Sequence, residues 1–580
     1  LYYTLTGLPP SMAAVTDFEA AANENRPAAV EAVVDRLTNS TAYGEHVARL
    51  WLDVARYADT DSAYRPDTKT PHYFPFAFTY RDYVIDSFNR DTPFDQFVKE
   101  QLAADLLGFK PSERQTAALG FLAIGPHARS NNQEAIDDRI DVTTRGLLGM
   151  TASCARCHDH KFEPVPTADY YALHGVFASI TRFNQLDEKR LPVLAHYKAS
   201  GADVASYKKK RAAIDKKIKA AEGKKSRGNN RSVSQKIRET ELAELLLFHP
   251  GAPAHTMVVA DIKTPVDSFI AIRGDVRNRG RKVGRRFLTV LDTSQSAFPT
   301  DNSGRLALAE KIVSAENPLT ARVYVNRIWG LVMGAHLVPT PSDFGLQGVP
   351  PQHPELLDWL AADFMRHGWS TKRLVKQLVL SRTFQQQSRH RDGAAAADPN
   401  NQFYWRANRR RLSIEEIRDT MLSVSAQLDR TVGGRAAELW GDIYLKRRAI
   451  YGYVNRFNLD PTLRAFDFPS RMQTRPRRNE SIVAPQALFT MNSPFVIDQA
   501  VAVTKSDAFR TAKSDENRVQ VTFNAILQRS PELAEVSRMV RFVEQQTRLF
   551  EKPRKGSTVT NPWPLVVQAL LMSNEFQYVD

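Results

Sequence analysis

Both cysteines of the 580-residue chain stand in one motif, Cys154-Ala155-Arg156-Cys157-His158. The C-x-x-C-H spacing is typical of covalent haem attachment. Two thiols one helical turn apart can add to the two vinyl groups of a haem, while the adjacent imidazole is presented to the iron. We therefore expect haem c, bound through Cys154 and Cys157, with His158 as the proximal ligand.

Two other chemistries use the same cysteine spacing. A redox-active dithiol is expected beside a βαβ pattern, whereas the flanks of this motif are typical of helix and loop. A structural zinc site needs two more ligands; His158 and His160 are present, but the chain has no second cysteine pair. The dithiol, the zinc site and an inert pair of cysteines stay open as alternatives to haem.

Polar residues before and after the motif are candidates for catalysis. His160 is too close in sequence to His158 to reach the same face of the iron, so we expect a supporting or proton-transfer role, or else a histidine bonded to the loop backbone. Asp59 and Asp61 begin a long loop, and such loops are often functional. This loop could bind a sugar, act as general acid or base, or hold calcium, and a merely solvated loop is the alternative. Its other polar residues are Tyr64, Arg65, Asp67 and His72.

Local signals place these residues between helices. A helix from Trp51 is expected to run out into the long loop. Thr92 as a cap and Pro93 as the first helical residue predict another helix, with an apolar stripe from Phe94 onward. A further helix is expected to open at residues 167–169, and Ser413 with Glu416 predicts a capping box.

These signals predict a mainly α fold in four parts. Residues 1–185 are expected to form the helical haem-bearing domain and residues 186–250 a basic helical hairpin or linker. Short β-rich runs at 255–262, 268–272 and 286–291 predict a small β module over residues 251–300. Residues 301–580 are expected to form a large helical domain.

Composition and charge narrow the function classes. A hydrophobic content of 42% with a charged content of 25% is ordinary for a water-soluble globular protein, and no stretch approaches the ~18 apolar residues of a membrane span. The net charge is +15, but residues 201–240 alone hold 13 Lys or Arg against 4 Asp or Glu. We expect this segment to be a solvated hairpin. The alternative is binding of a polyanion such as nucleic acid or an acidic polysaccharide. Nucleic acid ranks last of the functions considered, and no run of aromatic side chains on which bases could stack is interleaved with the basic ones.

A second basic stretch lies among aromatic residues near the end of the chain. Arginine suits two-point recognition of carboxylate or sulfate, so an anionic polysaccharide is a candidate partner, and a structural network is the favoured alternative. The arginines are Arg447, Arg448, Arg456, Arg471, Arg475, Arg477 and Arg478.

Several motifs in order along the chain carry a resemblance to a known family. They include Leu5-Thr6-Gly7-Leu8-Pro9-Pro10, the segment 51–61, the C-x-x-C-H motif with Asp159-His160-Lys161, Asp343-Phe344-Gly345, the segment 353–359 and Pro485-Gln486-Ala487-Leu488. The chain resembles the planctomycete cytochrome-like domain family, followed by its usual large C-terminal domain of unknown function. The resemblance implies a cytochrome-like haem domain in a secreted or periplasmic protein.

The same resemblance selects a second iron ligand. Similar sequences carry an Asn-His-Met-like stretch before the haem motif, whereas this chain has Pro126-His127-Ala128. Because the methionine is replaced, His127 becomes the candidate for the sixth position; another histidine, a methionine or an open site are the alternatives. A filled sixth site favours electron transfer, and an open one permits substrate chemistry.

Together these features predict a mono-haem c-type protein. We expect an oxidoreductase or electron-transfer protein, with an unidentified redox partner and complex carbohydrate as the candidate substrate. Covalent haem is attached outside the cytoplasm, so we expect a periplasmic or secreted protein with a signal peptide upstream of Leu1. The alternative is a non-enzymatic envelope or polysaccharide-binding protein whose cysteine pair is structural.

Overall fold

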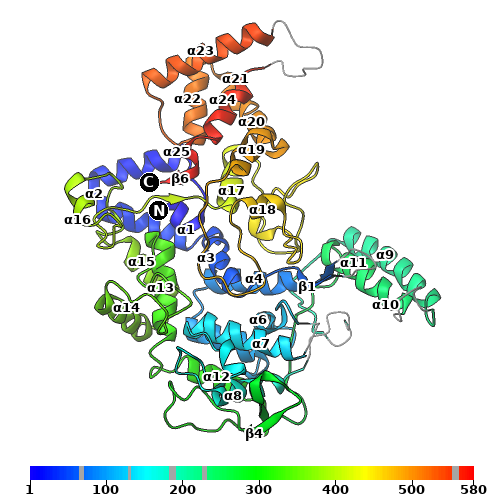
Figure 1. Cartoon of the computed structure of the whole chain (residues 1–580). Helices are drawn as coiled ribbons and strands as arrows, with labels where there is room; N and C mark the ends of the chain where they lie inside the picture. The colour runs from blue at the N-terminus through cyan, green and yellow to red at the C-terminus, as the bar shows by residue number, and fades with distance from the viewer. Residues whose placement is uncertain (65–70, 129–131, 182–187, 189–190, 225–231, 551–560) are drawn as a thin grey trace.

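The computed structural model describes residues 1–64, 71–128, 132–181, 188, 191–224, 232–550 and 561–580. Over these residues the chain is mainly helical, as predicted, and its strands form two-stranded antiparallel sheets (Figure 1). None of the described helices is both long and apolar enough to cross a membrane.

Over its described residues, the N-terminal region contains eight α-helices, of which the third is largely buried. The helices are α1 (Tyr2–Thr6), α2 (Met12–Thr38), α3 (Thr41–Val54), α4 (Ala77–Asn89), α5 (Phe94–Ala103), α6 (Gly120–Ala123), α7 (Asn132–Thr143) and α8 (Thr167–Ala178). Trp51 of α3 packs edge-on against Phe97 of α5, with ring centroids 4.9 Å apart, and donates a hydrogen bond to the Tyr80 hydroxyl at 3.0 Å. Glu45, His46 and Asp53 of α3 are buried as well, and they face charged partners in the C-terminal half.

The sequence predicts helix starts at residues 92–93 and at residues 167–169. The helix expected at residues 167–169 begins at Thr167, as predicted. The predicted apolar stripe is buried from Phe94 to Leu102, but its last member, Leu106, is exposed and lies beyond the end of α5. The predicted cap is wrong: α5 begins at Phe94, Pro93 holds the cap position, and no side chain bonds the first turn. Phe97 N–H instead bonds the Pro93 carbonyl oxygen at 2.8 Å.

The long loop expected after residue 58 is in part a hairpin. Strands β1 (Thr60–Tyr64) and β2 (Pro71–Tyr73) pair antiparallel, with Thr60 opposite Tyr73. The predicted loop residues Arg65 and Asp67 lie outside the described residues. This hairpin is held by the C-terminal half, because Asp59 N–H bonds the Val454 carbonyl oxygen at 2.9 Å.

The basic segment forms the predicted helical hairpin, which lies at one edge of the molecule (Figure 1). Its helices are α9 (Gly201–Ala220), α10 (Val233–Ile237) and α11 (Ala243–Phe248). Tyr207 and Ile218 of α9 are buried, whereas Lys208, Lys209 and Lys210 are exposed. The structure thus has the one-sided packing of a solvated hairpin.

The β module is smaller than predicted. Strands β3 (Ser268–Ala271) and β4 (Arg279–Val283) pair antiparallel. The runs at 255–262 and 286–291 make isolated bridges only, such as His255 with Val193 and Arg286 with Ala297. The first run bridges two different segments, at His255 and at Asp261, and the second run bridges one segment at Arg286, so the alternating sequence does not extend into a sheet.

The C-terminal half is helical, with one short sheet. Its elements are α12 (Arg305–Ile312), α13 (Thr320–Met333), α14 (Pro354–Arg366), α15 (Thr371–Val379), α16 (Asp392–Ala397), β5 (Arg410–Arg411), α17 (Ile414–Val424), α18 (Pro461–Ala465), α19 (Ala484–Asn492), α20 (Pro494–Thr504), α21 (Asp507–Thr511), α22 (Asp515–Ile526), α23 (Leu533–Phe550), α24 (Trp563–Leu571), α25 (Asn574–Gln577) and β6 (Tyr578–Val579). The predicted capping box is confirmed: Ser413 Oγ accepts from Glu416 N–H, and the Glu416 carboxylate accepts from Ser413 N–H at 2.8 Å.

Two hydrophobic cores divide the chain at a point that differs from the expected boundary at residue 301. The first core runs from Leu5 to Val379 and also takes in Tyr451, and the second runs from Leu412 to Phe576. Helices α12 to α15 therefore belong with the N-terminal region. The Phe94 and Tyr324 rings, for example, stack at 3.6 Å.

Candidate functional site

The C-x-x-C-H motif lies on an exposed turn between α7 and α8. Cys154 belongs to the 3₁₀ helix η4 (Ser153–Arg156), and Cys157 follows directly. Both thiols are free and exposed, whereas Ala155 between them is buried. The Tyr171 hydroxyl of α8 donates to the Arg156 carbonyl oxygen at 3.1 Å, which holds the turn on the helix below it. The two cysteines are therefore presented to solvent from an anchored turn.

His158 is exposed and oriented by its own loop. Its Nδ1 lies 2.7 Å from the Asp159 carbonyl oxygen, which can only accept, so Nδ1 carries the proton and Nε2 keeps a lone pair. Asp159 is itself fixed, because its carboxylate accepts from Thr167 N–H at 2.7 Å at the start of α8. That backbone hydrogen bond lowers the pKa of Asp159. An imidazole held through Nδ1 is the usual arrangement of a metal-ligating histidine.

Cys157 packs against a turn of the small β module. Gly274 has φ +76°, and a Cβ atom on it would lie 2.5 Å from Cys157 Sγ. The same turn exposes the apolar side chains of Ile272 and Val276, and Phe162 is exposed beyond the motif. The turn at Gly274 therefore borders Cys157 and carries exposed apolar side chains.

The donor set at the motif fits a covalent haem. Two exposed thiols and an imidazole with a free Nε2 are the groups that such a haem requires. Within the described ranges, no group of three or more His, Cys, Asp or Glu side chains is placed to hold a metal ion together. Haem attachment at Cys154, Cys157 and His158 stays a prediction, as does His158 as a metal ligand.

His160 has both ring nitrogens engaged. Nδ1 accepts from the backbone N–H groups of Phe162 at 3.2 Å and Glu163 at 2.8 Å, and Nε2 lies 3.3 Å from Thr151 Oγ1. Burial lowers its pKa. This is the loop-bonded histidine weighed as the alternative, and the zinc site stays open. A proton-transfer role for His160 stays a prediction.

His127 shares a pocket with Ser153, the residue before the first cysteine. The two residues line one pocket of 240 Å³ together with Glu134, Asp137, Asp138, Asp141 and Met472. His127 Nδ1 is 3.8 Å from the Glu134 carboxylate. His158 is not among the residues that line this pocket, so the two candidate iron ligands do not share it. Met472 is a thioether that the sequence analysis missed, because it is more than 300 residues from the motif.

Asp59 and Asp61 do not face solvent as a catalytic loop requires. Both side chains are fully buried, which corrects their expected surroundings. Asp59 accepts from the Tyr57 hydroxyl at 2.8 Å and from Val454 N–H at 2.9 Å, and burial raises its pKa to about 6. Asp61 accepts from Ser62 N–H at 2.6 Å. These contacts give the two carboxylates a structural environment; catalysis by them stays a prediction.

The C-terminal arginines form the structural network favoured over polysaccharide contact. Arg456 is buried and donates only to backbone carbonyl oxygens, including those of Thr60 and Ile124, each at 2.6 Å. Arg471 and Arg478 both bond the Asp53 carboxylate, and Arg448 bonds Asp419 at 2.7 Å. This part of the chain therefore binds the N-terminal region, while Arg477 stays exposed.

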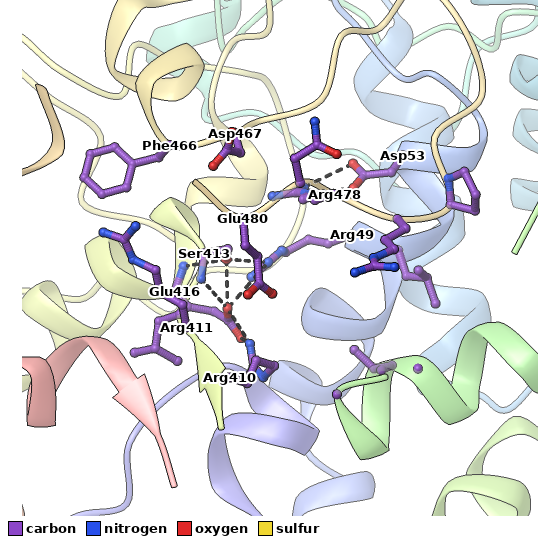
Figure 2. Close-up of a pocket in the computed structure, with 18 of the residues that line it drawn as sticks. Arg49, Asp53, Arg410, Arg411, Ser413, Glu416, Phe466, Asp467, Arg478 and Glu480 are labelled. Carbon is purple, nitrogen blue, oxygen red and sulfur yellow. Dashed lines mark hydrogen bonds and ion pairs between the residues drawn. The ribbon is translucent and has the colours of Figure 1, made fainter. Parts of the chain in front are cut away.

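A polar pocket of 380 Å³ lies where the two cores meet (Figure 2). Its walls come from α3, α13, strand β5 with the start of α17, and the segment 466–486. Figure 2 shows Arg49, Arg410, Ser413 and Glu416 linked by hydrogen bonds and ion pairs, with Glu480 beside them. His46, Arg49, Arg410 and Arg411 were not predicted from the sequence. The one local signal was that His46, Arg49 and Asp53 share a face of a helix.

Comparison with known families matches both halves of the chain. No curated protein and no solved structure matches it. Residues 304–543 match the family model PSD1, described as a protein of unknown function (DUF1553). Residues 1–182 match PSCyt2, described as a protein of unknown function (DUF1549). The chain therefore has the paired planctomycete-type arrangement that the sequence resemblance implied, with a DUF1549 segment at its N-terminus and a DUF1553 segment at its C-terminus.

Proposed function

We propose that this chain is a mono-haem c-type protein of the periplasm or the secreted fraction, acting in oxidation or electron transfer with complex carbohydrate as its substrate class. The observation that carries the proposal is the exposed Cys154 and Cys157 pair beside a His158 whose Nδ1 is bound to a backbone carbonyl. A dithiol or an inert pair has no need of an adjacent imidazole held in this tautomer.

The residues of the motif have separate roles in this proposal. Each cysteine S–H would add across one vinyl double bond, with the sulfur bonding to one carbon and the hydrogen going to the neighbouring carbon, so that no oxidant or reductant would be consumed. His158 supplies the Nε2 lone pair, and the bond from Thr167 N–H to Asp159 keeps the loop in place. The bound haem would supply a one-electron redox centre.

The test is covalent attachment followed by redox cycling. The protein is expressed with periplasmic maturation, denatured and weighed, and its visible spectrum is recorded oxidised and dithionite-reduced. We expect the added mass of one haem and a c-type spectrum, both absent from Cys154→Ala/Cys157→Ala. A colourless protein of unmodified mass from a host that matures a control cytochrome overturns the proposal.

The non-enzymatic alternative, an envelope or polysaccharide-binding protein with a structural cysteine pair, has its own supporting observation. The arginine-lined pocket at the junction of the two cores includes none of the cysteine-motif residues in its lining. Polysaccharide binding by protein that carries no haem would favour this alternative.

A further inference from the structure

The pocket where the two cores meet carries an excess of positive charge. Seven arginines line it, against the four acidic residues Asp53, Glu416, Asp467 and Glu480. Its two histidines add no charge near neutral pH: burial holds the pKa of His46 well below its ordinary range, and burial beside Arg477 and Arg327 lowers that of His336 to about 4. The lining therefore has a formal charge of about +3.

Three of the four acidic residues of the pocket already have hydrogen-bond partners, and the fourth, Glu480, is exposed. Glu416 receives two hydrogen bonds from Arg410, at 2.9 and 3.0 Å, and also caps α17. Asp53 is bonded by Arg478 and by Arg471, a residue outside the lining. Asp467 accepts from the backbone and hydroxyl of Ser481, both at 2.7 Å. Arg477 is exposed, and no described carboxylate forms an ion pair with it.

Several buried side-chain nitrogens at the same place lack a hydrogen-bond partner. Among the described residues, Nε and Nη1 of Arg49, Nη2 of Arg410 and Nε of Arg411 have no hydrogen-bond partner, and neither has either ring nitrogen of His46. The His46 side chain is only 3% exposed. Unpaired buried donors are costly, and the buried cations act through a medium of low dielectric. An anion in the pocket would accept hydrogen bonds from these unpaired donors, and the buried arginines would attract its charge.

We propose that this pocket binds the carboxylate or sulfate group of an anionic ligand of about sugar size. The exposed Arg477 and the partly exposed Arg410 would contact the anion directly, and Arg49 and Arg411 would stabilise its charge from the wall. A volume of 380 Å³ lies within the ~300–1,000 Å³ range of small-molecule sites. Arginine is suited to both anions because its planar fork matches two oxygens. The site does not depend on haem.

Arg477 is the residue to change, because it holds no described ion pair and its loss should leave the fold intact. Binding is measured by calorimetry with sodium sulfate, glucuronate and glucose, against sodium chloride at equal ionic strength. We expect sulfate or glucuronate to bind and glucose not to bind, and Arg477→Ala to weaken that binding about tenfold, the loss of one charge-assisted hydrogen bond. Arg477→Lys should fall between the two. Arg382→Ala, an exposed arginine outside the lining, is the matched control.

Each result of these titrations either supports or overturns the proposal. Binding of sulfate alone or glucuronate alone identifies the anion, and binding of both supports the shared chemistry. Equal losses in Arg477→Ala and Arg382→Ala, or no binding above the chloride background, overturn the proposal. Repeating the titration with Cys154→Ala/Cys157→Ala keeps this test apart from the haem proposal, because anion binding should be unchanged there.

Discussion

The carboxylate of Asp59 accepts a hydrogen bond from the backbone N–H of Val454 at 2.9 Å, and the Asp59 N–H bonds the Val454 carbonyl in return. The pair joins the start of β1 to a segment almost 400 residues later in the chain. Because Asp59 is fully buried, its ionisation is coupled to whether this junction is formed.

The raised pKa of Asp59 predicts a pH-dependent stability. Folding raises this pKa from 3.8 to about 6, so the folded state binds the proton more tightly than the unfolded chain does. The free energy of unfolding should therefore fall as pH rises from about 4 to about 6 and level off above it, by about 3 kcal/mol from this one group.

Asp59→Asn removes that titration. Its free energy of unfolding in urea, measured across the same range, should lack this fall, so that the difference from wild type changes with pH. The exposed Asp17→Asn should run parallel to wild type. If Asp59→Asn also runs parallel, the carboxylate does not titrate in this range.

Arg456 predicts a large loss of stability. Its guanidinium donates to the carbonyl oxygens of Arg471, Thr60, Gly125, Arg56 and Ile124, and the charge of Asp61 acts on it as well. Arg456→Met leaves these buried acceptors unpaired, so we expect a loss of about 3–5 kcal/mol. Urea unfolding measures it, with the exposed Arg475→Ala as control. A loss below about 1 kcal/mol would mean that water replaces the guanidinium.

Sequence signals succeeded where the interaction is local. The capping box of Ser413 and Glu416 spans three residues, and the buried stripe of α5 repeats with helical spacing, so both were predictable. The β1–β2 hairpin was not, because its polar, proline-rich sequence is typical of a loop and its pairing depends on Val454. The pocket draws residues from position 46 to position 486, and no local pattern indicates which arginines meet.

Gly274 predicts a selective effect on one thiol. A Cβ at this position would overlap Cys157 Sγ, so Gly274→Ala should displace that sulfur and slow its modification by a thiol reagent severalfold, while Cys154 reacts as before. Mass spectrometry of timed labelling distinguishes the two cysteines. Gly223→Ala shares the positive φ without any neighbour within 4 Å, and Gly284→Ala has open space in the same module. Slowing in either control would assign the effect to backbone strain or to the module as a whole.

Replacing His158 and replacing His127 should have different effects on the visible spectrum of the haem-bound protein. Because the thioether bonds do not require the imidazole, His158→Ala should keep the added mass but lose the reduced c-type spectrum. His127→Ala should keep both the mass and a ligated proximal side, and its spectrum should shift only if His127 fills the sixth position. His390→Ala is the matched control, because His390 also faces a carboxylate, that of Asp392 at 3.2 Å, and lies in a different part of the chain. A spectrum unchanged in both His127→Ala and His390→Ala would exclude His127 as the sixth ligand.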